Sequence, residues 1–332
     1  MKRSETFTTV LTEAHAGSRI DLVLSQVFPE ISRNQIQNLI KAKKVLMNGK
    51  VPKPRDIVEG GEEVSLEIEI DEGASAPEPQ AIALDILYED DDLLIVNKSA
   101  GMVVHPGAGN PNNTLMNALL YHYPPLKDLE RAGIVHRLDK ETSGALVIAK
   151  NEETAEALQK QFAERTVTRV YQALLVGELI SGRTVDAFIG RNPYNRKKMM
   201  ITEYDEELEE NPGKEAITHI RVLERFREHT LVECHLETGR THQIRVHMQH
   251  INLPIVGDPD YGSRLKIPRK FTHHAENVLR GFRRQALHAY QVGFIHPKTG
   301  EEVLATAPLP KDMTTLIDAI REDHELYVKD HF

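Results

Sequence analysis

The segment GIVHRLDKETSGALVIAKN contains residues that could carry out chemistry, because it places ionisable side chains close together in sequence. In it, His136, Arg137 and Asp139 follow an apolar pair, and a Thr-Ser-Gly turn then leads into a strand-like run. An apolar approach predicts that these groups lie in a partly buried place, where burial and neighbouring charges tune reactivity. Taken alone, the segment favours a loop that is stabilised by an arginine–aspartate ion pair.

A second segment, RVYQALLVGEL, alternates as a strand does and contains Tyr171. A tyrosine in such a strand is usually a core or surface aromatic. It becomes a candidate for chemistry only if its face of the strand points toward Asp139.

The third segment is LETGRTHQIRVHMQHINLPIVGD, in which Thr241 is the predicted cap of a short helix. The i, i+4, i+7 spacing of Ile244, Met248 and Ile251 places them on one face of that helix. Arg245 lies about 100° around the helix from that face. We therefore expect it to reach out beside the core instead of into it.

Other kinds of site are disfavoured by spacing. His242, His247 and His250 suggest a metal centre, but they lack the glutamate and the i+4 histidine of the zincin pattern, so no metal ligands are predicted. The sequence around Asp139 differs from the kinase catalytic loop because leucine stands between arginine and aspartate. Residues 107–110 lack the third glycine of the dinucleotide fingerprint and predict a simple turn.

Strand-like and helical patterns from residue 82 onward do not alternate one for one, which indicates an α+β domain on a mixed, mostly antiparallel sheet. The strand-like runs are DLLIVNK, GALVIAK, RVYQALLVG, HIRVLERF, TLVECHLE and QALHAYQVGFI. The helical patterns are NNTLMNALLYHY, NEETAEALQKQFAE and DMTTLIDAIRE. The acidic run 203–210 is expected to be a solvated loop.

The N-terminal region forms a small unit of its own in this interpretation. Residues 17–69 hold two apolar helical patterns, a turn at Asn48-Gly49 and the strand-like VSLEIEI. The expected organisation is an N-terminal extension at 1–16, this unit at 17–69, a linker at 70–81, a second domain at 82–322 and a C-terminal tail at 323–332. The linker is rich in proline, alanine and acidic residues.

The charge distribution separates the two regions further. The net charge of −9 argues against a nucleic-acid partner. However, the segment 33–55 contains seven basic residues and no acidic one, which predicts a local positive patch.

The single cysteine excludes a disulfide framework within the chain. Neither a signal peptide nor an apolar stretch of the length needed for a membrane span is present, so we expect a cytoplasmic protein with no membrane partner.

Together, HRLDKETSG, RVYQALLVG and GRTHQIRVHM resemble the RluA family of pseudouridine synthases. Further similarity lies in LDILYEDDDLLIVNK, GDPDYG and RQALHA, and the resemblance covers about residues 82–322. The N-terminal unit resembles an S4-type α/β RNA-binding domain through GSRIDLVLSQ, SRNQIQNLIKAKKVLMNGK and Gly60-Gly61. The acidic loop and the tail after Arg321 depart from the family pattern.

The resemblance implies a role for each candidate residue. Asp139 would be the catalytic carboxylate, Arg245 the partner that keeps it charged and oriented, and Tyr171 the aromatic that packs against the target base. Arg137 would occupy the place that an extruded uridine vacates, with His136 beside it as a second substrate-binding residue. Because the reaction gains and loses no atoms, it requires no cofactor.

The resemblance also implies the partner. Phosphate contacts would come from the S4-like patch, at Arg33, Lys41, Lys43, Lys44 and Lys50. Similarity to a family member in VVHPGAGNPNNTLMNALLYHYPP implies a monomer acting on 23S ribosomal RNA or on particles of the assembling large subunit, at the stem-loop called helix 69. The alternatives are a different RNA such as tRNA, a non-catalytic RNA-binding or ribosome-assembly protein, and a metal-dependent nucleotide hydrolase that uses the histidines.

Overall fold

The structure is a computed structural model that describes residues 2–29, 31, 33–71, 77–107, 110–195, 197–204, 212–262 and 265–331. The chain divides into two compact units, Met1–Ala76 and Pro77–Phe332. This division falls inside the segment 70–81 that was expected to be the linker, of which residues 72–76 lie outside the described ranges. Residues 205–210 of the expected acidic loop at 203–210 also lie outside the described ranges.

The first unit packs two helices against a small antiparallel sheet with the strand order β1-β3-β2. Its elements are β1 (Lys2–Val10), the 3₁₀ helix η1 (Glu13–His15), α1 (Ile20–Val27), α2 (Arg33–Lys41), β2 (Val45–Met47) and β3 (Glu63–Asp71). Apolar side chains of both helices and of β3 form its core, among them Ile20, Leu24, Ile36 and Leu66. The predicted turn is present, with φ of 50° at Asn48 and 74° at Gly49.

Residues 1–16 are not an extension separate from this unit. Residues 2–10 form β1, which pairs with β3 along its whole length. Its sequence, KRSETFTTV, is too polar to show a strand pattern by itself. The pairing partner in β3 explains why it is a strand.

The second unit is built on one sheet of ten strands, which confirms the predicted α+β class. The order is β4-β5-β6-β12-β7-β11-β10-β8-β9, with β13 on β12, and β6–β12 is the parallel pair in an otherwise antiparallel sheet. The strands are β4 (Ile86–Glu89), β5 (Leu93–Lys98), β6 (Ser143–Ala149), β7 (Thr168–Val176), β8 (Arg183–Arg191), β9 (Met199–Thr202), β10 (Lys214–Arg225), β11 (His229–Leu236), β12 (Leu287–Ile295) and β13 (Glu302–Thr306).

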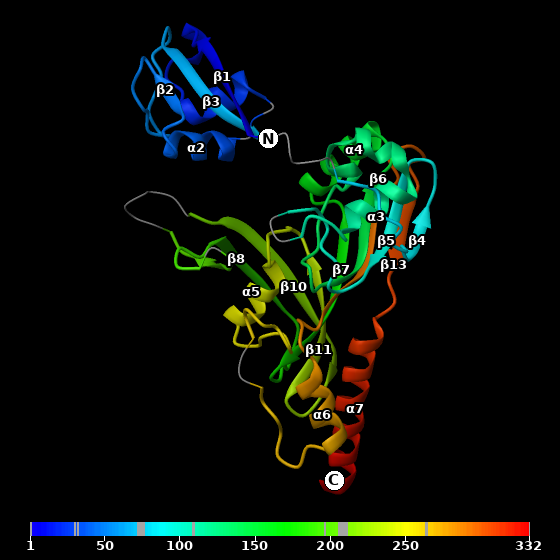
Figure 1. Ribbon diagram of the computed structural model, residues 1–332. Coiled ribbons are helices and arrows are strands. Elements are labelled where there is room, and N and C mark those ends of the chain that lie inside the picture. The colour runs from blue at the N-terminus through cyan, green and yellow to red at the C-terminus, as the bar shows by residue number, and fades with distance from the viewer. Residues whose placement is uncertain are drawn as a thin grey trace. The chain divides into compact units, whose positions relative to one another are not determined.

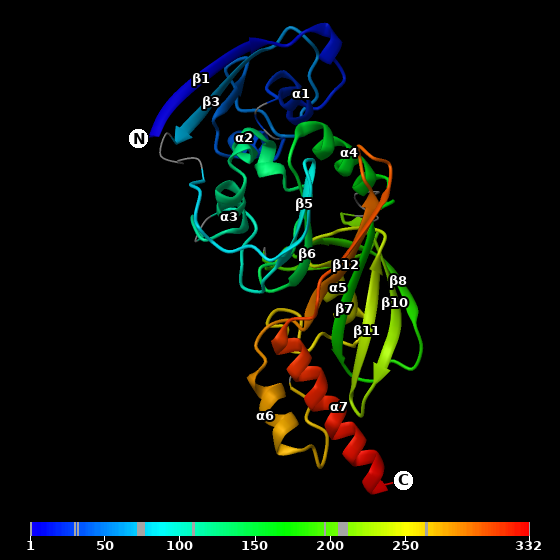
Figure 2. The same cartoon turned by 90° about the vertical axis from the view of Figure 1, so that its right-hand side faces the viewer.

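Helices cover different parts of this sheet, as Figures 1 and 2 show: α3 and α4 lie near β5 and β6, while α6 and α7 lie together at the opposite end. Their bounds are α3 (Leu115–His122), α4 (Glu152–Ala163), α5 (Gln243–His250), α6 (His273–Gly281) and α7 (Lys311–His331), with 3₁₀ helices η2 (Pro124–Asp128) and η3 (Glu130–Gly133). None of the helices in the described ranges is long and apolar enough to cross a membrane.

Two predictions about helix ends were wrong. The expected tail from residue 323 is the continuation of α7, which runs to His331. The first turn of α5 is preceded by His242, not capped by Thr241, and His242 has a left-handed backbone with φ of 56°. A non-glycine residue in this conformation is uncommon, and such positions concentrate at functional sites.

The centre of the sheet fixes the position of the segment around Asp139. All seven residues of β6 are buried, as expected for a strand covered on both faces. At its start, Gly144 has φ of 118°, and a Cβ there would lie 2.2 Å from the carbonyl oxygen of Ala289 in β12. Glycine therefore permits the close parallel contact between β6 and β12 directly after the Asp139 loop.

Candidate active site

The segment from Asp139 to Thr142 forms a turn before β6, and hydrogen bonds from three side chains hold this turn in place. Lys98, which is 1% exposed, donates from Nζ to the carbonyl oxygens of Ser99 at 2.9 Å, Met102 at 3.0 Å and Lys140 at 3.1 Å. Burial lowers the pKa of Lys98 to about 8. This side chain therefore links the end of β5 to the turn.

Arg284 and Gln285 hold the other side of the same turn. Arg284 donates to the carbonyl oxygen of Glu141 at 3.2 Å and is itself held by two bonds to Asp312, at 2.7 and 2.9 Å. The amide of Gln285 donates to Oγ1 of Thr142 at 3.1 Å. With its backbone anchored in this way, the turn presents the Asp139 side chain at a defined place.

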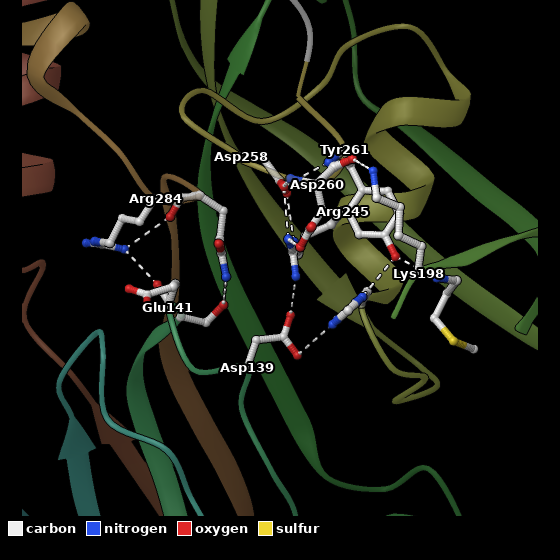
Figure 3. A network of polar contacts seen from close by, with 12 residues as sticks. Asp139, Glu141, Lys198, Arg245, Asp258, Asp260, Tyr261 and Arg284 are labelled. Carbon is white, nitrogen blue, oxygen red and sulfur yellow. Dashed lines mark hydrogen bonds and ion pairs between the residues drawn. The ribbon is translucent and has the colours of Figure 1, made fainter. Parts of the chain in front are cut away.

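Asp139 is bound by Arg245, from a helix that is 106 residues further along the chain (Figure 3). Nη1 of Arg245 donates to Oδ2 of Asp139 at 3.1 Å. The arginine side chain is 4% exposed, whereas that of Asp139 is 19% exposed. The prediction that Arg245 stays outside the core was wrong, because it is buried and its guanidinium points across to the Asp139 turn.

Two further carboxylates orient the guanidinium of Arg245. Asp258, whose side chain is fully buried, accepts from Nε at 2.7 Å and from Nη2 at 2.9 Å, and Asp260 accepts from Nη2 at 2.8 Å. Burial opposes the charge of Arg245, but the bonds to Asp258 and the charge of Asp139 raise its pKa overall. Such bidentate pairs are strong and directional, so the arginine has little freedom to leave Asp139.

His242 stands on the other side of the carboxylate. Its Nε2 lies 3.8 Å from Oδ1 of Asp139, and its Nδ1 lies 2.9 Å from the hydroxyl of Tyr261. That hydroxyl also accepts from the backbone nitrogen of Met199 at 2.7 Å. Burial lowers the pKa of His242, although the charge of Asp139 opposes this. A neutral imidazole that accepts a hydrogen bond from the Tyr261 hydroxyl at Nδ1 carries its own proton on Nε2. That Nε2–H would then point toward Asp139.

Tyr171 and Arg137 meet Asp139 at two adjoining cavities. The first cavity, of about 60 Å³, and the second, of about 350 Å³, are both lined by these three side chains together with His242. Burial, with a contribution from Asp139, raises the pKa of Tyr171 to about 12, so its phenol keeps the proton. Arg137 is exposed.

His136 lines the larger cavity too, but one of its nitrogens is occupied. Nε2 accepts from the backbone nitrogen of Val147 at 2.9 Å, and the ring packs 4.8 Å from that of Phe162. Burial, with a smaller effect of Arg169, lowers its pKa to about 3. This geometry favours a supporting role for His136 over direct contact with a substrate.

The three histidines of the metal hypothesis do not form a ligand set. In the described ranges, the group with three potential ligand atoms within 4.8 Å of one another is Asp90, Asp92 and His296. That group is already paired internally and with Lys298.

The five basic residues predicted to contact RNA lie on or near α2 and β2. Lys41, Lys43 and Lys50 are exposed, and Lys44 is partly buried. Arg33 forms an ion pair with the buried Asp21, with Nη2 at 3.0 Å from Oδ2, although 44% of the arginine side chain is exposed.

Sequence reasoning missed Asp258, Asp260, Tyr261 and the position of His242 beside Asp139. The first three lie in GDPDYG, a segment that had been noted only as similar to the family. A run with two aspartates and a tyrosine after a strand-like stretch was the available signal.

Comparisons with known proteins identify the family of this chain. The sequence pattern of RNA pseudouridylate synthases matches residues 92–250, and that of the S4 domain matches residues 18–64. The chain is 49% identical over 314 residues to the ribosomal large subunit pseudouridine synthase D of Xanthomonas campestris pv. campestris, covering 95% of this chain and 92% of that protein. It is 47% identical over 319 residues to the Escherichia coli K12 protein of the same name, covering 96% and 95%.

The fold also resembles a solved structure, human RNA pseudouridylate synthase domain containing 4. The TM-score is 0.56 at 27% identity, over 71% of this chain and 93% of the human one. The chain therefore belongs to the RluA-type family of RNA pseudouridine synthases and carries an S4 domain.

Proposed function

We propose that this enzyme converts uridines of large-subunit ribosomal RNA to pseudouridine, with Asp139 as the carboxylate that acts on the ribose. The observation that carries the proposal is the pairing of a partly exposed Asp139 with a buried Arg245 at the wall of a cavity. The names of the relatives support the large subunit as the source of the substrate. From such a substrate we infer a cytoplasmic enzyme.

The chemistry needs a charged carboxylate and no cofactor. The bond between uracil N1 and ribose C1′ breaks, the base turns and C5 joins C1′. The hydrogen of C5 leaves as a proton and N1 takes up a proton, so the composition is unchanged. A carboxylate can attack C1′ or take the C2′ proton. Both routes require the ionised form, which the adjacent guanidinium of Arg245 stabilises and orients.

The other residues act on the base and on the RNA. A uridine must leave its stack to reach the cavity, at a cost of a few kcal/mol. Arg137, exposed at the cavity rim, takes the vacated place, and the protonated phenol of Tyr171 packs against the base and can donate to it. His136 supports this wall of the cavity.

The S4 domain supplies phosphate contacts that do not depend on sequence. We assign these contacts to the exposed Lys41, Lys43 and Lys50, with Lys44 and Arg33 beside them. The expected target is the helix 69 stem-loop of 23S RNA, free or in assembling particles, and the expected active species is a monomer.

The test uses RNA carrying tritium at C5 of uridine. Tritium release is expected from 23S transcripts and from a helix 69 stem-loop, and not from 16S transcripts, tRNA or a 23S transcript without helix 69. The Asp139→Ala variant should release none. Release from tRNA alone would show that the substrate is wrong, and no release from any RNA, including assembling large-subunit particles, would refute the activity.

A further inference from the structure

The larger cavity beside Asp139 is lined by two arginines that the mechanism above does not use, Arg169 of β7 and Arg240 of the turn between β11 and α5. Neither forms an ion pair with any residue in the ranges that the structure describes. A guanidinium remains charged at all physiological pH values. Buried charges in proteins are normally paired with an opposite charge. Two partly buried arginines without an ion-pair partner, on a protein with a net charge of −9, therefore suggest that an external anion binds there.

Arg169 is held in place without being neutralised. Its Nη2 donates to the carbonyl oxygens of Glu237 at 2.9 Å and Leu236 at 3.4 Å, and its guanidinium carbon lies 5.6 Å from the ring centre of Phe162. Its Nε is buried and has no hydrogen-bond partner among the described residues. Burial and the nearby charge of Arg240 both lower the pKa of Arg169.

Gly239 leaves the space that the guanidinium of Arg169 occupies. A Cβ at this position would lie 2.6 Å from Nη1 of Arg169, and the next nearest atom would be 3.9 Å away. Because the φ of Gly239 is outside the left-handed region, the backbone itself does not require glycine. The absence of a side chain at Gly239 therefore leaves the room that Nη1 of Arg169 occupies.

Arg240 is fixed in a similar way. Its Nε donates to the backbone oxygen of Glu215 at 2.9 Å, and its backbone nitrogen donates to the side chain of Gln243 at 2.9 Å. The carboxylates nearby are engaged elsewhere, since Glu215 pairs with Arg165, and Glu237 with His219 at 2.6 Å. Both arginines thus have rigid positions and unused donors.

We propose that Arg169 and Arg240 form a binding site for one phosphodiester group of the RNA, directly 5′ or 3′ of the target uridine. The proposal rests on the pseudouridine synthase function. Phosphodiesters are the anionic groups of this substrate, and guanidinium forks bind them in a bidentate manner. Since Asp139 and Tyr171 line the same cavity, a uridine with its C1′ at Asp139 brings its flanking phosphates within reach of that wall.

The first test separates binding from chemistry. Arg169→Gln and Arg240→Gln should each raise KM for the RNA about 10- to 100-fold, the range for loss of a hydrogen bond to a charged group. We expect kcat to stay within about twofold and the salt slope of log KM to fall by about 1. Gly239→Ala, which displaces the Arg169 guanidinium without changing the charge, should raise KM in the same direction, and Arg169→Lys should restore part of the loss.

Arg183→Gln is the matched control for net charge, because Arg183 is an exposed arginine of the same sheet that lines neither cavity. It should leave KM and the salt slope unchanged. If the cavity variants fold, as circular dichroism can establish, and behave like Arg183→Gln, the phosphate site does not exist. A variant that unfolds is replaced in this test by Gly239→Ala.

The second test identifies the phosphate. Stem-loops with a neutral methylphosphonate 5′ or 3′ of the modified uridine are compared on the wild type and on Arg169→Gln. A methylphosphonate at the phosphate that the site binds should raise KM of the wild type about 10-fold or more. The same substitution should raise KM of Arg169→Gln little further. Fully additive losses at both positions would overturn the proposal. A wild type that converts no RNA would instead refute the activity itself.

Discussion

Each unit of this chain contains an aspartate held by arginine, but the accessible partner differs. In the S4 domain, Asp21 has a fully buried side chain and accepts hydrogen bonds from Arg19, Arg33 and Gln37. The side chain of Arg19 is 37% exposed and that of Arg33 is 44% exposed. In the catalytic unit the arrangement is reversed, because Arg245 is 4% exposed and Asp139 is 19% exposed. In the catalytic unit it is therefore the carboxylate, and not the arginine, that remains accessible, and it lies at a cavity.

The chemical environments of the two aspartates follow from this reversal. Burial would raise the pKa of Asp21, but the hydrogen bonds from Gln37, Arg19 and Arg33 lower it on balance. The hydrogen bonds to Asp21 therefore stabilise the fold of this unit. At the second site, the buried Arg245 is fixed by Asp258, so its remaining donor can serve a carboxylate that still faces a cavity.

The largest expected effect comes from exchanging the two aspartates for asparagine separately. Asp139→Asn should reduce turnover by at least about 10³-fold, as the loss of a reacting group does, while leaving the unfolding free energy nearly unchanged. Asp21→Asn should lower stability by about 1–3 kcal/mol and leave turnover of the folded enzyme intact. Tritium release and urea unfolding measure the two quantities, and equal effects of the two variants on turnover would contradict the comparison.

The second effect concerns Arg245, which has both a structural and a functional partner. Arg245→Met strands the buried Asp258 and should cost about 3–5 kcal/mol of stability as well as turnover. Adding Asp258→Asn removes the stranded charge, so the double variant should regain part of the stability and none of the turnover. Recovery of both would mean that Arg245 acts only through folding.

The smallest effect is a pH dependence confined to the catalytic unit. Burial holds the pKa of His136 at about 3 in the folded state, against about 6.5 in an unfolded chain. The unfolded state binds the extra proton below pH 6.5, so stability is unaffected above that pH and is lost as the pH falls toward 3.

His136→Gln, whose amide oxygen can accept from the nitrogen of Val147, should flatten this decline between pH 7 and pH 5 in urea unfolding. His274→Gln, at an exposed histidine, is the control. Because the first unit, Met1–Ala76, contains one histidine, His15, its own unfolding should change little over this range. An identical pH slope in wild type and His136→Gln would remove His136 as the cause.

Local patterns predicted the elements with strong periodicity and missed the polar ones. The apolar runs that became β5, β6, β7, β10, β11 and β12 were found, as were α3 and α4. The strands β1, β4, β8, β9 and β13 and the helix α6 were not. Sequences such as RTVDAFIGR bury few residues and need a neighbouring strand to define them. Register with that neighbour is not encoded in a short window of sequence.

The sequence by itself determined that Asp139 sits between charged residues at the start of a buried strand, and that it belongs to a recognisable family motif. Only the tertiary structure decided which arginine binds it and which carboxylates hold that arginine. It also decided that Arg169 and Arg240 lie beside the cavity with no ion-pair partner among the described residues. The physical reason is that hydrophobic periodicity acts over a few residues. The contacts of Asp139 instead depend on sheet order, which inserts β12 between β6 and β7 and brings α5 to a turn 106 residues earlier.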